Sequence, residues 1–438
     1  MTGVQNEASK HRTDASSFEV LLVCDFDSAL SSRILDAYRF FQATPRIVLA
    51  RRGGSMSVDS RLSVELELVP GRVKGLDATS VAGWMLVVIN SVLYVLYAFI
   101  LGLKLIVHRT KVQIVHAHFI FPQGLFGLLL AFMLRVPLVV TAAGRDVNII
   151  MRRNRLVREL CLLVLRRAVT TIAVSIPLQE SLRNFGVKNT IYIPNSVDFD
   201  SIPLVDEYAN HSSLLYVGSM TRNKDPMTLL HAFELIVRSI PSAQLTMCGD
   251  GPLMPLVKDE IAKNKLEDKV KALSFVPPES LCEIRSKTPI FVLPSRSEGL
   301  SLALLEAMAA GQLIIVSRIP SHISILKDEE TALFFDVDDE VGLSRQLQRA
   351  ISERLLGHKI ESAARQLCRN EFSNSVVARK LESIYLNAIR GCNSYSPLRD
   401  ESTPRTSVEK SSDLGNAQPV PGCALICSKL CFHSVFDR

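Results

Sequence analysis

The sequence has few of the features that mark a secreted protein. Its nine cysteines are scattered without a Cys-x-x-Cys pair, so reduced thiols of the cytosol are expected in place of a disulfide framework. Residues 1–17 are polar and lack the apolar stretch of a secretory signal. We therefore expect a disordered N-terminus and a protein that meets its substrates in the cytosol.

The chain also lacks a strong excess of charge. Its 50 Lys and Arg residues outnumber its 44 Asp and Glu residues by six, and no motif typical of DNA or RNA binding is present. This surplus permits anionic partners, such as nucleotide phosphates or a lipid surface, without indicating nucleic acid. A chain of 438 residues is too long for one ordinary core, so we expect two domains and tails.

One long stretch has no charged residue at all, namely Val81–Leu103. About 20 apolar residues suffice to cross a bilayer as a helix. A single crossing, however, would put the predicted strands at Phe18–Cys24 and Val112–Val115 on opposite sides of the membrane, although both belong to one parallel sheet. We interpret the stretch as a helix that is partly buried and partly dips into the membrane interface. An ordinary core helix and a true span are the alternatives.

A second segment, Met151–Arg167, points to the same kind of surface. Leu156, Leu160 and Leu163 recur at helical spacing, which predicts a basic amphipathic helix suited to anionic lipid. A solvated charged face over a core helix is the alternative. A single Glu accompanies the six arginines of this segment, Arg152, Arg153, Arg155, Arg158, Arg166 and Arg167.

The most informative stretch begins with the apolar run Ile290–Leu293, which predicts a buried parallel strand. Leu300–Ala310, followed by Gly311, predicts a helix with a glycine C-cap, and Leu313–Val316 predicts the next strand. In such a right-handed crossover, ligands bind beyond the carboxyl ends of the strands. The loop Ser295–Gly299 lies there and ends at a helix N-terminus, where free N–H groups and the helix dipole favour a phosphate.

Two carboxylates accompany this predicted phosphate site. Glu298 lies at the start of the helix and Glu306 two turns into it. Carboxylates beside a phosphate can accept hydrogen bonds from hydroxyl groups, which suggests a ligand with both phosphate and sugar hydroxyls. The alternative is a Glu that complements the helix dipole and a second Glu in a salt bridge.

The spacing Glu298-x7-Glu306, within residues 294–311, resembles the E-x7-E signature of the family 4 retaining glycosyltransferases, and shorter motifs extend the likeness over residues 18–390. The resemblance implies an α/β chain with the GT-B fold, two Rossmann-like domains facing across a cleft. It also implies a nucleotide-diphosphate sugar as donor substrate, with no metal and no other cofactor. In the family, the first Glu faces the donor sugar, the following amides hold the distal phosphate and the second Glu contacts the ribose, which implies roles for Glu298, Gly299, Leu300, Ser301 and Glu306.

Shorter motifs imply the rest of the donor site. The family places the second His of Val-His-Ala-His against the donor sugar and diphosphate, so His118 becomes a catalytic candidate. Lys224 matches a lysine that binds the diphosphate, whereas Ser219 replaces the family's arginine, and Arg222 could reach the same phosphates from one turn away. Surface charge is the alternative role for both cations. Gly251 matches a glycine at which the backbone bends close to the nucleotide.

The chain departs from the family pattern at several places. Thr141–Asp146 matches Thr-x-His-Gly-x-Asp with Ala143 in place of His, and Asp146 either orders the acceptor or caps a helix. A glycine-rich loop is replaced by Asp25–Ser28, and a Gly-Gly-x-x-Glu is missing at Ser321–Ser324. These departures support an alternative, a catalytically inactive relative that binds nucleotide or acts as a scaffold. An epimerase on the same fold is disfavoured by the E-x7-E stretch.

The resemblance sets the expected organisation. We expect an acceptor-binding Rossmann-like domain over residues 18–203, a nucleotide-sugar-binding domain over 204–373, a terminal helix over 374–390 that crosses back to the first domain, and a disordered tail over 391–438. The expected reaction is retaining transfer of a sugar to a glycan or lipid-linked acceptor in polysaccharide or cell-envelope synthesis. The expected location is cytoplasmic and peripheral, at the anionic inner face of the membrane.

Overall fold

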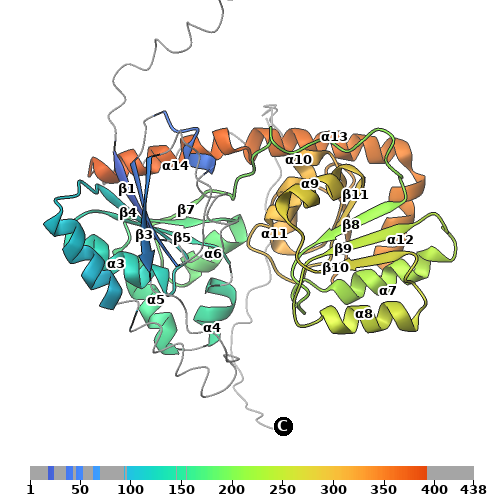
Figure 1. Ribbon diagram of the computed structural model, residues 1–438, viewed down its shortest axis with the longest axis horizontal. Helices are drawn as coiled ribbons and strands as arrows, with labels where there is room; N and C mark the ends of the chain where they lie inside the picture. Colours follow the sequence, from blue (N-terminus) through green and yellow to red (C-terminus); the bar gives the residue numbers. More distant parts are fainter. Residues whose placement is uncertain are drawn as a thin grey trace, which may run out of the picture. The chain divides into compact units, whose positions relative to one another are not determined.

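A computed structural model describes residues 18–23, 36–42, 46–52, 63–69, 93, 96–144, 146–153 and 155–391. Two parallel β-sheets with helices on both faces account for most of this part of the chain (Figure 1). The α/β class and the two Rossmann-like domains are thereby confirmed. The predictions for residues 1–17, for Asp25–Ser28, for most of residues 81–95 and for the tail after residue 391 lie outside the described residues.

The first sheet is parallel in every pairing, with the order β3-β2-β1-β4-β5-β6-β7. β1 and β5 are buried along their whole length, which fits their near-continuous apolar sequences. The strand expected at Val112–Val115 begins two residues later and includes both histidines of the Val-His-Ala-His motif. The strands are β1 (Glu19–Val23), β2 (Arg46–Arg52), β3 (Ser63–Val69), β4 (Ile114–His118), β5 (Leu138–Ala142), β6 (Thr170–Ala173) and β7 (Thr190–Tyr192).

Alternate residues of the first sheet face two different helical layers. Leu21, Val115 and Val140 belong to a core shared with α3 (Gln123–Leu134), α5 (Arg155–Arg167) and the helix over residues 96–107. Val20, Ile114 and Val139 belong to a second core shared with residues 38–41 and with α14 (Asn374–Ile389). The side chain of His116 therefore lies on the α14 face. The remaining helices here are a turn of π-helix (Asp146–Ile150), α4 (Met151–Arg153) and α6 (Ile176–Asn184).

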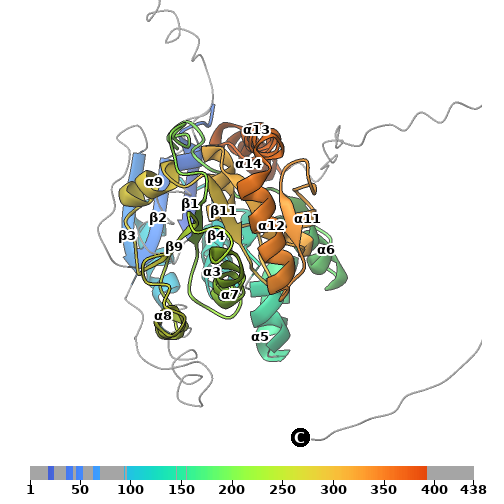
Figure 2. The ribbon, with the colours of Figure 1, turned by 90° about the vertical axis from the view of Figure 1, so that its right-hand side faces the viewer.

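The second sheet has the order β10-β9-β8-β11-β12-β13, again parallel. One of its faces packs on α7, α8 and α12 and the other on α10 and α13. In Figure 2, α13 lies above β9 and β11, and α7 and α8 lie below them. The strands are β8 (Ser213–Val217), β9 (Gln244–Cys248), β10 (Val270–Leu273), β11 (Ile290–Leu293), β12 (Leu313–Ser317) and β13 (Leu333–Phe335). The helices are α7 (Pro226–Val237), α8 (Met254–Lys263), α9 (Pro278–Ser286), α10 (Leu302–Ala310), α11 (Pro320–Ile323), α12 (Glu340–Ser352) and α13 (Arg354–Glu371).

The crossover predicted around Glu298 is present as β11, α10 and β12. Gly311 has φ 74°, the left-handed conformation expected of a glycine C-cap. The helix begins at Leu302 and not at Leu300, because Ser301 is extended and occupies the N-cap position. Gly299, Leu300 and Ser301 therefore separate Glu298 from the first residue of α10.

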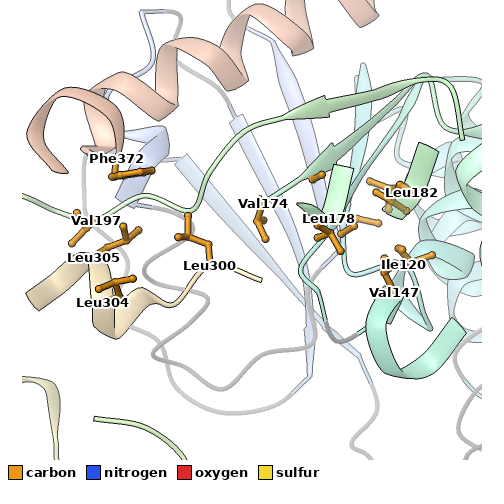
Figure 3. Packing of buried hydrophobic residues seen from close by; sticks show 14 of the residues in the cluster. Ile120, Val147, Val174, Leu178, Leu182, Val197, Leu300, Leu304, Leu305 and Phe372 are labelled. Atoms are coloured by element: carbon orange, nitrogen blue, oxygen red, sulfur yellow. The ribbon is translucent and has the colours of Figure 1, made fainter. Parts of the chain in front are cut away.

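Apolar side chains of the two domains meet in one buried cluster. Val174 and Leu178 from the first domain belong to the same cluster as Leu300 and Leu304 from the second (Figure 3). The two passages of the chain between the domains also touch, since the amide of Val197 donates to the carbonyl oxygen of Phe372 over 2.9 Å.

The helix over residues 96–107 has an apolar face on each side. Ala98, Leu101 and Leu105 are buried, and Gly102 lies close to Met133 of α3. Within the described residues, no helix combines the length and the apolar character needed to span a bilayer. We call the opposite side of this helix the apolar helix surface; its exposed members are Leu96, Phe99, Ile100, Leu103, Ile106 and Val107.

Within the basic segment Met151–Arg167, the structure describes two stretches as helix, α4 (Met151–Arg153) and α5 (Arg155–Arg167). The core-facing side of α5 carries Cys161 and Leu165, while Leu156 and Leu163 are 69% and 44% exposed. Of the three leucines that recur at helical spacing, Leu156 and Leu163 therefore face outward together with arginines.

A buried ion pair joins α9 to α10. Arg285 is the largest fully buried side chain among the described residues, and its Nη2 donates to Oε2 of Glu306 over 2.7 Å. Its Nη1 also donates to Oε1 of Gln312 over 3.3 Å. Removing one partner of such a pair leaves the other charge buried without compensation.

We expect Arg285→Met to lower the free energy of unfolding by about 3 kcal/mol, because the Glu306 carboxylate loses its guanidinium. Urea denaturation followed by circular dichroism measures the change. The control is Lys287→Met, which removes an exposed pair with Glu283 and should cost less than about 1 kcal/mol. Equal effects of the two substitutions would contradict a special role for the buried pair.

Candidate active site

A cavity of about 410 Å³ lies where the carboxyl ends of strands from both sheets converge. Parallel strands place the loops that follow them at one edge, so residues distant in sequence meet there. From the first domain the cavity wall includes His116, His118 and Thr141. From the second domain it includes Gly218, Ser219, Lys224, Glu298, Leu300 and Ser301.

Lys224 and Glu298 form an ion pair at this wall. Lys224 follows β8 and Glu298 follows β11, and these strands are neighbours in the second sheet. Nζ of Lys224 lies 2.5 Å from Oε1 of Glu298, and the Ser295 hydroxyl donates to the same oxygen over 2.6 Å. The two side chains are 20% and 10% exposed, so the charges are shielded from most solvent but open to the cavity.

The loops that carry this pair are also tied through Asn223. Its side-chain Nδ2 donates to the main-chain carbonyl oxygen of Ser297 over 2.8 Å. Its main-chain carbonyl oxygen accepts from the main-chain amide of Arg296 over 2.8 Å. The Arg296 guanidinium pairs with Asp225 over 3.0 Å and also with Asp338. Asp225 occupies the N-cap position of α7 and accepts from the Thr228 hydroxyl, not from a backbone amide.

His116 and His118 stack beside one another on β4, with ring centroids 4.3 Å apart. Their i, i+2 spacing puts both on the same face of the strand. Burial lowers the pKa of His118 to about 4, and burial together with the neighbouring His118 holds the pKa of His116 well below its usual range. Both imidazoles are neutral at pH 7 and act as hydrogen-bonding groups without charge.

Close backbone approaches require glycine at two of the predicted positions. A Cβ on Gly299 would collide with the carbonyl oxygen of Ala143, so the loop of the second domain lies against the loop of the first. Gly251 has φ 155°, and a Cβ there would lie 2.5 Å from the carbonyl oxygen of Met220. Substitution at either position would displace a cavity loop.

Glu306 lies apart from the main cavity, in a smaller one of about 170 Å³. Its carboxylate there accepts from Arg285, and the small cavity shares Ser196 and Leu302 with the main one. A ligand extending from the main cavity past Leu302 would therefore reach Glu306.

Besides Gly251, Gly299 and Glu306, two further predicted residues are not among those that line the main cavity. Arg222 is exposed and is not among the residues that line the cavity with Lys224. Asp146 is 1% exposed and accepts from the amides of Ile120, Gly144 and Val147 over 3.0, 3.1 and 3.2 Å. This geometry fits the capping role that was one of its two interpretations.

Other residues at the site had no clear sequence signal. Tyr38 and Thr141 line the cavity, and Val377 and Leu381 reach it from α14. Asn195, in the segment Ile-Pro-Asn-Ser-Val-Asp, donates from Nδ2 to the carbonyl oxygen of Leu300 over 2.8 Å. A motif match could have pointed to Asn195, but nothing local marks Tyr38 as a cavity residue.

The described arrangement can bind an anion and hydroxyl groups side by side. Lys224 and the N-terminus of α10 attract negative charge, and Glu298 accepts hydrogen bonds. Donors fixed around a developing negative charge also stabilise its formation, because they need no reorganisation during the reaction.

Comparisons with known proteins agree on one family. Residues 206–367 match the family model described as "Glycosyl transferases group 1", and residues 69–201 match the model described as "Glycosyltransferase Family 4". The two matched segments together span both described sheets, apart from the first strands of the first sheet.

Among curated proteins, N-acetyl-alpha-D-glucosaminyl L-malate synthase of Bacillus anthracis is 24% identical over 65% of this chain and 77% of its own length. The UDP-Gal:alpha-D-GlcNAc-diphosphoundecaprenol alpha-1,3-galactosyltransferase of Escherichia coli is 24% identical over 66% and 79%. Among solved structures, Anabaena Alr3699/HepE in complex with UDP and glucose has a TM-score of 0.66 at 14% identity, covering 84% of this chain and 99% of its own. Sucrose-phosphate synthase of Thermosynechococcus elongatus gives 0.67 at 16%, covering 85% and 100%. These structural likenesses confirm the predicted GT-B fold.

The buried histidines predict acid sensitivity. Unfolded histidine titrates near pH 6.5, whereas His118 and His322 fold with pKa values of about 4, so between these limits the unfolded chain binds protons that the folded chain does not. Stability is therefore full above pH 6.5 and falls as the pH drops towards 4. The free energy of unfolding of the wild type should fall between pH 7.5 and pH 5. In His118→Gln we expect this fall to be smaller by about 2 kcal/mol.

Urea unfolding at the two pH values measures this difference, and comparing each protein with itself cancels any cost of the substitution at neutral pH. If His118→Gln kept the wild-type pH dependence, a protonated His118 in the folded protein would be indicated.

Proposed function

Because the chain belongs to the family 4 glycosyltransferases with the GT-B fold, we propose that it transfers a sugar, with retention of configuration, from a nucleotide-diphosphate sugar to an acceptor at a membrane surface. One observation carries the proposal: Lys224, Glu298, His118 and the start of α10 meet in a single cavity. The motif matches and this convergence are independent of each other.

In the proposed reaction, the donor diphosphate binds Lys224 and the amides at Leu300 and Ser301. The phosphate takes the place of Glu298 as the partner of the Lys224 ammonium, and the freed carboxylate accepts hydroxyl hydrogen bonds from the donor sugar. Breaking the glycosidic bond leaves an oxocarbenium-like sugar and puts negative charge on the diphosphate. Lys224 and the helix N-terminus stabilise that charge, while His118 contacts the sugar as a neutral donor or acceptor.

The same placement of the donor diphosphate predicts the remaining donor contacts. The ribose would extend past Leu302 to Glu306 in the small cavity. Since Arg222 is exposed and Ser219 replaces the family's arginine, Lys224 supplies the main side-chain charge for the diphosphate among the described residues. One fewer charge-assisted contact weakens donor binding by about 1.5 to 3 kcal/mol.

The acceptor side of the proposal rests on the surface of the first domain. The apolar helix surface includes Ile100 and Val107, which are 60% and 76% exposed. Exposed Lys104, Arg109 and Lys111 adjoin this surface in sequence. Exposed apolar side chains flanked by cations fit the interface of an anionic bilayer.

α5 adds a second element of the same character. It lies on the same face of the first sheet as the helix over residues 96–107 and exposes Leu156 and Leu163 beside Arg155 and Arg166. A membrane-bound enzyme of this kind would meet a lipid-linked acceptor, the class named for the related Escherichia coli galactosyltransferase. We propose a peripheral location at the cytoplasmic face of the membrane and a role in polysaccharide or cell-envelope synthesis.

A second candidate is an inactive relative that binds nucleotide as a scaffold. It is favoured by Ser219, which stands on the cavity wall where the family has an arginine, and by Ala143 in place of histidine. An inactive scaffold would release no sugar from any donor, so hydrolysis of the donor without acceptor separates the two candidates.

We expect Glu298→Gln and Lys224→Ala each to lower kcat for donor hydrolysis about 100-fold, because each removes a group that stabilises the transition state. The donor is first chosen by thermal shift from a panel of UDP-, GDP- and ADP-sugars. Lys263→Ala, which removes an exposed cation paired with Glu260, is the control and should keep wild-type rates. Near-normal turnover in both cavity variants would remove the assignment.

We expect the protein to float with vesicles of phosphatidylglycerol and phosphatidylcholine, and high salt to weaken the binding because salt screens the basic residues. Phe99→Asp combined with Ile100→Asp should reduce the floating fraction at least tenfold. Leu355→Asp, at a residue that is 89% exposed on α13, is the matched control. A double variant that floats like the wild type would contradict this surface, and a wild type that never floats would favour a soluble acceptor.

A further inference from the structure

Tyr385 of the terminal helix α14 contacts His116, one of the two neighbouring histidines of β4. The Tyr385 hydroxyl lies 2.5 Å from Nδ1 of His116 and 2.5 Å from the Tyr38 hydroxyl. The other ring nitrogen of His116, Nε2, lies 2.8 Å from the Thr141 hydroxyl. A chain of hydrogen bonds therefore runs from Tyr38 through Tyr385 and His116 to Thr141, and three of these four residues line the cavity.

This chain constrains the His116 ring completely. A neutral imidazole carries one proton, so if Nδ1 accepts from Tyr385, then Nε2 donates to Thr141, and the reverse holds for the other tautomer. Both nitrogens are engaged, and a flip of the ring would have to break two hydrogen bonds at once. The Tyr385 hydroxyl thus holds the orientation of the His116 ring, and the direction of its hydrogen bond is coupled to the tautomer of His116.

His118 depends on that ring. It stacks on His116 at 4.3 Å between centroids with an interplanar angle of 37°, and His116 is 1% exposed. Tyr385 meets the His116 ring edge to face, at 5.6 Å and 75°. A shift of His116 would therefore move the imidazole that the proposed reaction places against the donor sugar.

Tyr385 comes late in the chain, and its contact with His116 therefore links the terminal helix to the first sheet. It belongs to α14, which follows the second domain in sequence but packs on the first sheet with Val377 and Leu381 at the cavity. One turn away on α14, Oε2 of Glu382 accepts from the amide of Gln42 over 3.0 Å, so the helix has a separate anchor on the same segment as Tyr38.

We propose that Tyr385 is a positioning residue for His118, acting through the hydrogen bond between its hydroxyl and Nδ1 of His116, and that α14 thereby completes the active site of the first domain. The expected effect of Tyr385 on the rate rests on the proposed function. The contact between Tyr385 and His116 does not depend on that function.

The test compares Tyr385→Phe with Glu382→Ala. Both substitutions remove a hydrogen bond between α14 and residues 36–42, but only the first removes the partner of His116. With the sugar nucleotide that gives the largest thermal shift, Tyr385→Phe should lower kcat for hydrolysis about tenfold and leave KM for the donor within about twofold, as for other groups that orient a ligand-contacting histidine. Glu382→Ala should lower the melting temperature and keep kcat.

The ring nitrogens supply a readout that does not need catalysis. Two-dimensional NMR of the protein labelled with ¹⁵N-histidine should show one tautomer for His116 in the wild type and in Glu382→Ala, and a mixture or the other tautomer in Tyr385→Phe. Equal losses of kcat in both variants, or an unchanged His116 spectrum in Tyr385→Phe, would refute the positioning role. If the wild type hydrolysed no sugar nucleotide, the proposed function would fail, while the spectra would still decide the contact.

Discussion

The ion pair between Lys224 and Glu298 is the interaction on which the account of this protein depends. It joins the loops after two neighbouring strands of the second sheet and brings a cation and a carboxylate together at the N-terminus of α10. Each charge is the other's partner in this structure, and the Ser295 hydroxyl donates to the same carboxylate oxygen that Lys224 contacts. A ligand with a diphosphate and a sugar offers a new partner to each charge, so a pair that stabilises the loops also prepares the donor site.

The site requires both domains, and several contacts hold the loops of the two domains against each other. Gly299 lies against Ala143, and Asn195 holds the carbonyl oxygen of Leu300, so the loop of Glu298 is fixed by the first domain as well as by its own sheet. α14 then brings Tyr385 back to His116. The cavity is therefore a property of the whole folded chain, which is the reason that its acceptor side is harder to identify from local motifs than its donor side.

Much of the donor side could be predicted from sequence because its signals are local. A buried apolar strand, a loop and a helix with a glycine C-cap follow one another within residues 290–311, and the helix start was wrong by two residues only because Ser301 is extended. The resemblance predicted a terminal helix over residues 374–390, and the structure has it as α14 (Asn374–Ile389). GT-B membership followed from the spacing of Glu298 and Glu306, which belong to one crossover.

The rest depends on contacts between distant residues. Arg285 is buried against Glu306, and no local pattern distinguishes it from the exposed Lys287 two positions later. Arg222 was expected to reach the phosphates from one turn away, and this stays a prediction for a residue that is exposed after β8. Tyr385 contacts a histidine 269 residues away. Spacing predicts which face of an element a residue occupies, and it cannot predict what another element places on that face.

A crystal structure with a bound sugar nucleotide tests the central claim most directly. The account predicts the diphosphate at Lys224 and at the amides of Leu300 and Ser301, with Glu298 released from Lys224 and turned to the sugar. A diphosphate bound elsewhere, beside an unbroken pair of Lys224 and Glu298, would contradict it.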